Sequence, residues 1–211
     1  MTLRRALMAD PQMVQRWQAV KRYQSERLRR TYADLLLIPR YGAAAQFFLD
    51  DLYGERDFEQ RDREALRVVP KLARMLPERA IETMALAVEL DELSEILDAR
   101  VAGNIELPLD DAGYRRAYRG AGTRPERERQ IAMVDAIGRA LDGLARLPLL
   151  TSMLRLMRVP AEAAGLEHLH RFLTRGFHSF RAMHGAGEFL DTVRRRETAL
   201  MEELFGPSPG S

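Results

Sequence analysis

Apolar residues recur every three or four positions along most of the chain, and no segment shows the strict alternation that is typical of a half-buried strand. The clearest stripe lies within residues 77–102 and consists of Leu86, Leu90, Leu93, Leu97 and Val101. Further apolar residues widen this stripe, so we expect this helix to be central to the core. The pattern predicts an all-α protein, a single compact bundle of eight to ten helices with short connections and no β-sheet.

Capping residues, prolines and glycines divide the chain into its expected helices. Asp10 and Pro11 begin the first helix, Thr123 and Glu126 form a capping box, and Gly206 follows the last helix. The expected helices are 11–36, 42–53, one opening at Asp57-x-x-Gln60 and interrupted at Pro70, 77–102, 111–119, one from Thr123, a short one between Pro148 and Pro160, 166–184 and 188–205.

The length of 211 residues suits one domain with a substantial core. We expect a single all-helical domain over residues 1–206, with a possible subdomain boundary near 103–124, and a disordered tail at 207–211. No apolar run approaches the roughly 20 residues that span a bilayer. The chain has no cysteine and no apolar core of signal-peptide length near its start, so we expect a cytoplasmic protein that makes no membrane contact.

Charge is distributed unevenly along the chain, although the net charge is only +2. Residues 1–40 carry nine basic residues against three acidic ones, whereas residues 82–111 carry nine acidic residues against one arginine. These segments can neutralise each other within the fold or across a dimer, without an external polyanion. Arginine-rich helices at 16–30 and 115–129 leave weak nucleic-acid binding as an alternative, which the interleaved glutamates and the low net charge disfavour.

Residues 47–62 break a local rule of helix electrostatics. Asp50 and Asp51 fall in the last turn before Gly54, at the negative end of the helix dipole, which suggests a specific partner. We expect Phe47 and Leu52 to lie in the core. The apolar residues of this helix end span a broad arc, however, and one core would not cover all of it, so we expect the remainder to contact a partner. The interaction candidates are Phe47, Phe48, Asp50, Asp51, Leu52, Tyr53, Arg61 and Asp62.

The octet Phe47-Phe48-Leu49-Asp50-Asp51-Leu52-Tyr53-Gly54 resembles the defining motif of an uncharacterised bacterial family, the FFLEELY-motif proteins. Aspartate stands here in place of both family glutamates. The resemblance implies no activity, cofactor or catalytic residue. Residues 201–206 repeat the pattern of 49–54, with two acids before a capping glycine. An amphipathic helix with a glycine cap can show this pattern without a shared role, and we favour that interpretation; the alternative is that arginines neutralise both acidic pairs, with 194–196 as one possible source.

All four histidines fall between residues 168 and 184, which is the best chemical lead in the chain. Glu167-x-x-His170 matches one half of a helical di-iron site, but a second such unit is absent. A single axial histidine for haem is a further alternative. His170 and His184 are about 21 Å apart along one helix and cannot share a metal ion. Glu167, His170 and His184 therefore rank as weak ligand candidates, and we expect no cofactor and no metal.

No catalytic motif stands out. The serines lack a glycine-flanked elbow, and no glycine-rich phosphate loop precedes a lysine. We therefore expect a non-enzymatic protein-interaction or regulatory module that uses the helix end at 47–54 as its hub. Its partner would be another protein or a second copy of the chain.

Overall fold

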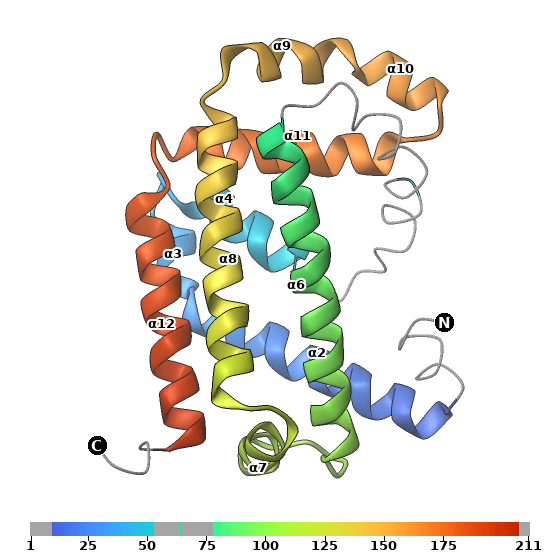
Figure 1. Cartoon of the computed structure of the whole chain (residues 1–211), viewed down its shortest axis with the longest axis vertical. Helices are drawn as coiled ribbons and strands as arrows, with labels where there is room; N and C mark the ends of the chain where they lie inside the picture. The colour runs from blue at the N-terminus through green and yellow to red at the C-terminus, as the bar shows by residue number, and fades with distance from the viewer. Residues whose placement is uncertain (1–9, 53–63, 65–77, 207–211) are drawn as a thin grey trace. The chain divides into compact units, whose positions relative to one another are not determined.

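The computed structural model describes residues 10–52, 64 and 78–206 of the chain. These residues form ten α-helices and one π-helical segment, without any strand (Figure 1), which confirms the all-α prediction. The elements are α2 (Pro11–Thr31), α3 (Ala33–Leu37), α4 (Gly42–Phe47), η1 (Phe48–Leu52), α6 (Glu78–Gly103), α7 (Asp111–Ala121), α8 (Arg124–Ala145), α9 (Pro148–Leu156), α10 (Arg158–Ala163), α11 (Glu167–Ala182) and α12 (Gly187–Phe205). None of the helices in this part of the chain is long and apolar enough to cross a membrane.

The chain divides into two compact units that interleave in sequence. Unit 1 comprises residues 1–31, 86–136 and 190–211, and unit 2 comprises residues 32–85 and 137–189. The divisions fall inside α6, α8 and α12 and between α2 and α3, so none lies in the 103–124 stretch. The expectation of a single folding domain stays a prediction.

Unit 1 is built around a buried cluster to which α2, α6, α7 and α12 contribute. In Figure 1, α7 is viewed end-on and crosses the ends of α6 and α8. Its tyrosines carry much of the apolar contact: Tyr114 stacks on Tyr23 with ring centroids 4.2 Å apart, and Tyr118 meets Phe205 at 5.3 Å. The buried cluster consists of Ala19, Val20, Val101, Ala102, Ile105, Tyr114, Ala117, Tyr118, Ala121 and Leu204.

The long helix α6 contributes to the core mainly through its C-terminal half. Leu97 and Val101 are fully buried, as the leucine stripe predicts. Val88, in contrast, is 68% exposed. The expected central position therefore holds for only part of this helix.

Unit 2 has an aromatic core on α4, η1, α11 and the start of α12. Rings of Phe47, Phe48, Phe172, Phe180 and Phe189 meet at centroid distances of 5.3–6.4 Å. The helices α9 and α10 run along one side of α11 (Figure 1).

Helix starts are fixed by local side chains at the positions that the sequence predicts. Asp10 Oδ1 accepts the amide of Gln12 at 2.9 Å. The capping box closes in both directions, because Thr123 N donates to Glu126 Oε2 at 2.8 Å and Glu126 N donates to Thr123 Oγ1 at 3.4 Å. At the other end of the chain, α12 stops at Gly206, whose φ of 78° is a left-handed cap.

The helix predicted over 11–36 is interrupted, which corrects that prediction. α2 ends at Thr31 because the Thr31 carbonyl oxygen accepts a hydrogen bond from Arg196 Nη1 at 2.6 Å. The amide of Leu35, which a continuous helix would direct to Thr31, instead donates to the Tyr32 carbonyl at 3.0 Å. The side chain that occupies the helix carbonyl comes from 165 positions along the chain, so no local signal could reveal it.

Two further boundaries differ from expectation. The helix expected over 42–53 becomes π-helical from Phe48 to Leu52. Pro160 does not end the helical region, because it lies in the first turn of α10, where its missing amide costs nothing. The capping box expected at 57–60 and the interruption at 70 lie outside the described residues.

Candidate functional site

Phe47 of the predicted interaction block lies in the core of unit 2. It is 3% exposed, and its ring centroid is 5.3 Å from that of Phe172. Gly176 of α11 faces the same ring, at a point where a Cβ would lie 2.8 Å from Phe47 Cζ. Phe47 therefore has almost no surface to offer a partner, in agreement with its expected core position.

The rest of the block is a π-helical end. Phe48 is half-buried, with its ring 6.2 Å from Phe180 and 5.7 Å from Phe189. Leu49 is 2% exposed and Phe47 is 3% exposed, so two residues that point to different sides of this helix are both buried. π-helical segments are rare and occur frequently at functional sites. Asp50 accepts a hydrogen bond from Gln46 Nε2. The side chains of Asp51 and Leu52, and all of Tyr53, Arg61 and Asp62, lie outside the described residues, so their interaction role stays a prediction.

Two of the histidines are tied to the surrounding structure. His170 is half-buried and its Nε2 lies 2.8 Å from the Leu154 carbonyl oxygen, so this nitrogen is engaged within the protein. His168 Nδ1 lies 2.9 Å from Oε1 of Glu64, a carboxylate that is only 2% exposed. Glu64 Oε2 also accepts the amide of Leu169 at 2.8 Å, so this carboxylate caps the N-terminus of α11. Sequence reasoning missed Glu64, because its partners are more than a hundred positions away.

The three weak ligand candidates do not converge. Glu167 is exposed, with its carboxylate 3.8 Å from His168 Nδ1, while His170 Nε2 is occupied by a carbonyl. His184 lies beyond the end of α11. Across the described ranges, no group of three or more histidine and carboxylate side chains is arranged to hold a metal ion.

His184 instead lines a pocket of about 330 Å³ in unit 2, together with Asp142, Ala145, Arg146, Pro148, Phe180, Arg181 and Gly185. Its backbone is left-handed, with φ of 51°. Arg181 donates to Thr151 Oγ1 and so ties α11 to α9. Sequence reasoning singled out His184 but had no signal for the two arginines beside it.

A second surface feature lies along α9, its flanking residues and the start of α10, where several large apolar side chains are exposed. We call it the α9–α10 surface; its members are Leu147 (43% exposed), Met153 (43%), Leu156 (79%), Met157 (40%) and Val159 (65%). Arg155 and Arg158 lie among them, and no acidic residue occurs between Asp142 and Glu162. Sequence reasoning assigned this segment only as a short helix, because periodicity does not distinguish a buried stripe from an exposed one.

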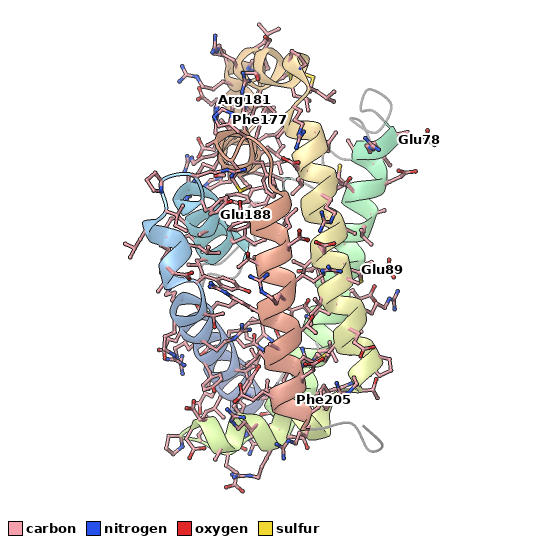
Figure 2. The ribbon with its side chains drawn as sticks, turned by 90° about the vertical axis from the view of Figure 1, so that its left-hand side faces the viewer. Glu78, Glu89, Phe177, Arg181, Glu188 and Phe205 are labelled. Atoms are coloured by element: carbon pink, nitrogen blue, oxygen red, sulfur yellow. The ribbon has the colours of Figure 1, made fainter. Side chains whose placement is uncertain are left out.

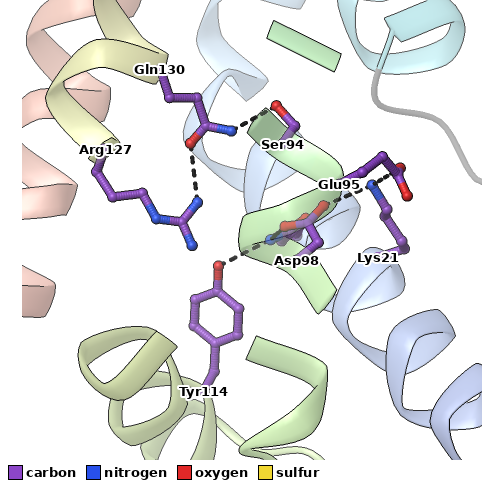
Figure 3. Close-up of polar contacts among 8 residues, drawn as sticks. Lys21, Ser94, Glu95, Asp98, Tyr114, Arg127 and Gln130 are labelled. Atoms are coloured by element: carbon purple, nitrogen blue, oxygen red, sulfur yellow. Dashed lines mark hydrogen bonds and ion pairs between the residues drawn. The ribbon is translucent and has the colours of Figure 1, made fainter. Parts of the chain in front are cut away.

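Unit 1 encloses a polar network (Figure 3). Lys21 Nζ pairs with Asp98 at 2.7 Å and with Glu95 at 3.2 Å. Burial lowers the pKa of Lys21, but the two carboxylates outweigh that effect and raise it above its usual value. Gln24 Nε2 donates to Asp98 at 2.8 Å and to the Tyr114 hydroxyl at 3.3 Å. The network thus joins α2 to α6 and α7.

Arg127 occupies the opposite side of this network. The guanidinium is buried, lies 4.3 Å from the centroid of the Tyr118 ring and donates to Gln130 Oε1 at 3.0 Å. Gln130 in turn donates to Ser94 at 2.8 Å. Burial raises the pKa of Tyr118 to about 12, so this hydroxyl stays protonated at neutral pH. Arg127 Nε and Nη2 are buried and have no hydrogen-bond partner among the described residues, so the bond to Gln130 and the contact with the Tyr118 ring hold this guanidinium in place.

The acidic helix end at 201–206 is met by arginines, but from an unexpected source. Arg115 pairs with Glu203, Arg119 donates to the Leu204 carbonyl, and Arg124 donates to the Gly206 carbonyl at 3.0 Å. Of the suggested source at 194–196, Arg196 donates to the Thr31 carbonyl and Arg195 to Thr192; a role of this segment at Asp50 and Asp51 stays a prediction.

The whole chain was compared with known proteins. Neither the curated proteins nor the solved structures gave a match. A family model described as "Domain of unknown function (DUF8198)" matches residues 3–210. Because this match covers nearly the entire sequence, the protein belongs to the DUF8198 family, an uncharacterised domain family.

Proposed function

We propose that this protein is a non-enzymatic binding module whose α9–α10 surface docks an acidic, apolar segment of another protein. The observation that carries the proposal is the exposure of five large apolar side chains within residues 147–159, on α9, the start of α10 and the residues that flank α9. Isolated exposed leucines are ordinary on protein surfaces, whereas a contiguous apolar patch typically marks an interaction site.

The attachment of α9 supports this proposal. The Leu154 carbonyl binds His170, and Thr151 binds Arg181. The residues that attach α9 to α11 are therefore different from the exposed apolar residues of the α9–α10 surface. Leu156 and Val159 thus stay available on a helix that is already held in place. A preformed surface of this kind lowers the entropic cost of binding.

The charge of the surface suggests the chemistry of the partner. Arg155 and Arg158 are both exposed, and Arg158 has only a long contact of 3.9 Å to Glu162. Carboxylates of a partner would find these guanidinium groups beside apolar anchor sites. An amphipathic helix with acidic flanks fits this combination best.

Photo-crosslinking tests the proposal in the source cells. A benzophenone amino acid is placed at Leu156, which is 79% exposed, and at Leu37, which is 84% exposed and outside the α9–α10 surface. We expect a discrete protein adduct from position 156 and none of the same mass from position 37. Equal labelling at both positions, or no adduct at 156, would overturn the proposal.

Affinity then measures the contribution of the surface. Leu156→Ser should weaken binding of the crosslinked partner roughly tenfold, because it removes a large apolar anchor. Leu37→Ser is the matched control and should leave affinity unchanged. If the adduct is a second copy of this chain, sedimentation should show a dimer that Leu156→Ser dissociates, and the module is then self-associating.

A further inference from the structure

The turn between α11 and α12 holds a strained residue against the pocket of unit 2. His184 adopts φ of 51°, a left-handed conformation that residues with a Cβ rarely take. Gly185 follows with φ of 120°. This φ favours glycine, whereas a Cβ on Gly185 would make only an ordinary contact of 3.4 Å with Arg146 Nη2.

Hydrogen bonds from two sides hold this turn in place. Arg40 Nε donates to the Met183 carbonyl at 2.7 Å, and Arg40 Nη2 donates to the Gly185 carbonyl at 3.1 Å. Asp142 Oδ1 accepts the amide of Ala186 at 3.1 Å. Arg40 and Tyr41 both contact Glu188 at the start of α12, which Figure 2 labels. Strained residues that the surrounding structure fixes so firmly cluster at ligand-binding sites.

The charges around the pocket favour an anion. Among the described residues, Asp142 is the one carboxylate in its lining, and both of its oxygens are engaged, Oδ1 by Ala186 N and Oδ2 by Arg146 Nη2 at 2.6 Å. Arg181, labelled in Figure 2, adds a second guanidinium and His184 adds an imidazole. The lining therefore carries more positive than negative charge.

The remaining lining is apolar and consists of Ala145, Pro148 and Phe180. Phe180 is 2% exposed and Ala145 5%, so both back the pocket from the core, and Pro148 is the exposed apolar residue of the lining. A volume of about 330 Å³ lies in the range of small-ligand sites. Arginine at the mouth and an apolar wall behind it match a molecule with one anionic end and one apolar end.

We propose that this pocket binds a small organic carboxylate, with the carboxylate group against Arg181 and Arg146 and an aromatic or branched body against Pro148. His184 contributes a hydrogen bond to the bound anion from its fixed left-handed position. The pocket borders α9, because Pro148 begins that helix and Arg181 donates to Thr151, but neither proposal requires the other.

Titration of the full-length chain with three probes tests the site by NMR chemical shifts. Benzoate carries the carboxylate and an aromatic body, benzamide is its neutral counterpart, and inorganic phosphate is an anion without the apolar part. We expect saturable benzoate binding with Kd below about 10 mM and at least roughly tenfold weaker binding of benzamide. Phosphate should also bind more weakly than benzoate. Equal binding of benzoate and benzamide, or no saturation by benzoate, would overturn the proposal.

Variants locate the binding. Arg181→Gln should weaken benzoate binding roughly tenfold, while Arg171→Gln, an exposed position on the same helix, should leave it unchanged. His184→Asn retains a residue that tolerates the left-handed backbone and should weaken binding several-fold. Melting curves of each variant establish that the fold is retained, and Arg146→Gln replaces Arg181→Gln if the latter melts early. Wild-type binding by the folded arginine variant, or an equal loss in Arg171→Gln, would refute the assignment.

Discussion

The ring of Phe47 lies against the backbone of Gly176, so close that a Cβ at Gly176 would be 2.8 Å from Phe47 Cζ and 3.3 Å from both Cε atoms. The ring cannot withdraw easily, because it is 3% exposed and meets Phe172 and Phe48 on other sides. This contact joins the helix end that carries the family-like octet to α11, the histidine-bearing helix.

Gly176→Ala should therefore destabilise the protein by about 1–3 kcal/mol through overpacking, measured by urea unfolding. Gly120→Ala is the matched control, because no atom lies within 4 Å of its added Cβ. That helical position should gain about 0.5–1 kcal/mol from the better helix propensity of alanine. Adding Phe47→Leu to Gly176→Ala should restore part of the loss. Equal stability of Gly176→Ala and wild type would mean that the ring has room to move.

Lys21 neutralises the buried carboxylate of Asp98, which is 4% exposed. Lys21→Met should lower the free energy of unfolding by about 3 kcal/mol, because it leaves that carboxylate without its cation. The double variant Lys21→Met/Asp98→Asn should recover a large part of the lost stability, because no unpaired charge then remains at position 98. Arg22→Met, at an exposed position of the same helix, is the control and should change the free energy of unfolding little.

The pH dependence of this pair follows from the raised pKa of Lys21. A raised pKa means that the stabilisation is complete below the ordinary value of 10.5 and is lost only as pH rises beyond it. The difference between wild type and Lys21→Met should thus be constant from pH 6 to about 9. A difference that declines within that range would contradict the raised pKa.

Glu126 has a lowered pKa, so its contribution to stability depends on pH in the opposite direction from that of Lys21. The backbone amide of Thr123, Arg100 and the Thr123 hydroxyl together lower the pKa of Glu126 from 4.5 to about 2. The stabilisation by this carboxylate is present above about pH 4.5 and is lost as pH falls toward 2. The side chain is 32% exposed, so screening by solvent limits the effect to about 1 kcal/mol.

Glu126→Ala should accordingly lower stability at pH 7, and the difference from wild type should fade as pH falls toward 2. Unfolding by urea at a series of pH values measures it. Glu128→Ala, an exposed position on the same helix, is the control and should change stability little at any pH. A pH-independent loss in Glu126→Ala would show that the capping box acts through packing alone.

Glu64 should be more important for stability than any other acid near α11. Glu64→Ala leaves the Leu169 amide and His168 without their buried acceptor and should cost about 1–3 kcal/mol. Glu167→Ala, in the exposed first turn of the same helix, should cost less than about 0.5 kcal/mol. Similar melting temperatures for both variants would contradict the role of Glu64 as a helix cap.

The candidate site could be predicted only in part. The clustering of histidines drew attention to His170 and His184, and the structure places one on a carbonyl and the other in a pocket. Arg146 and Arg181, which give that pocket its charge, carry no local signature in an arginine-rich chain. They meet there because α8 and α11 pack in unit 2.

The sequence by itself determined the helical class and most helix ends. Asp10, the Thr123–Glu126 pair and Gly206 act on backbone groups within four residues, so their effects can be read from neighbouring letters. Tertiary structure decided which side chains meet. Arg196 ends α2 from 165 positions away, and the exposure of Leu156 depends on what α9 packs against. Periodicity defines an apolar face, but only the packing of distant helices decides whether that face is buried or free to bind.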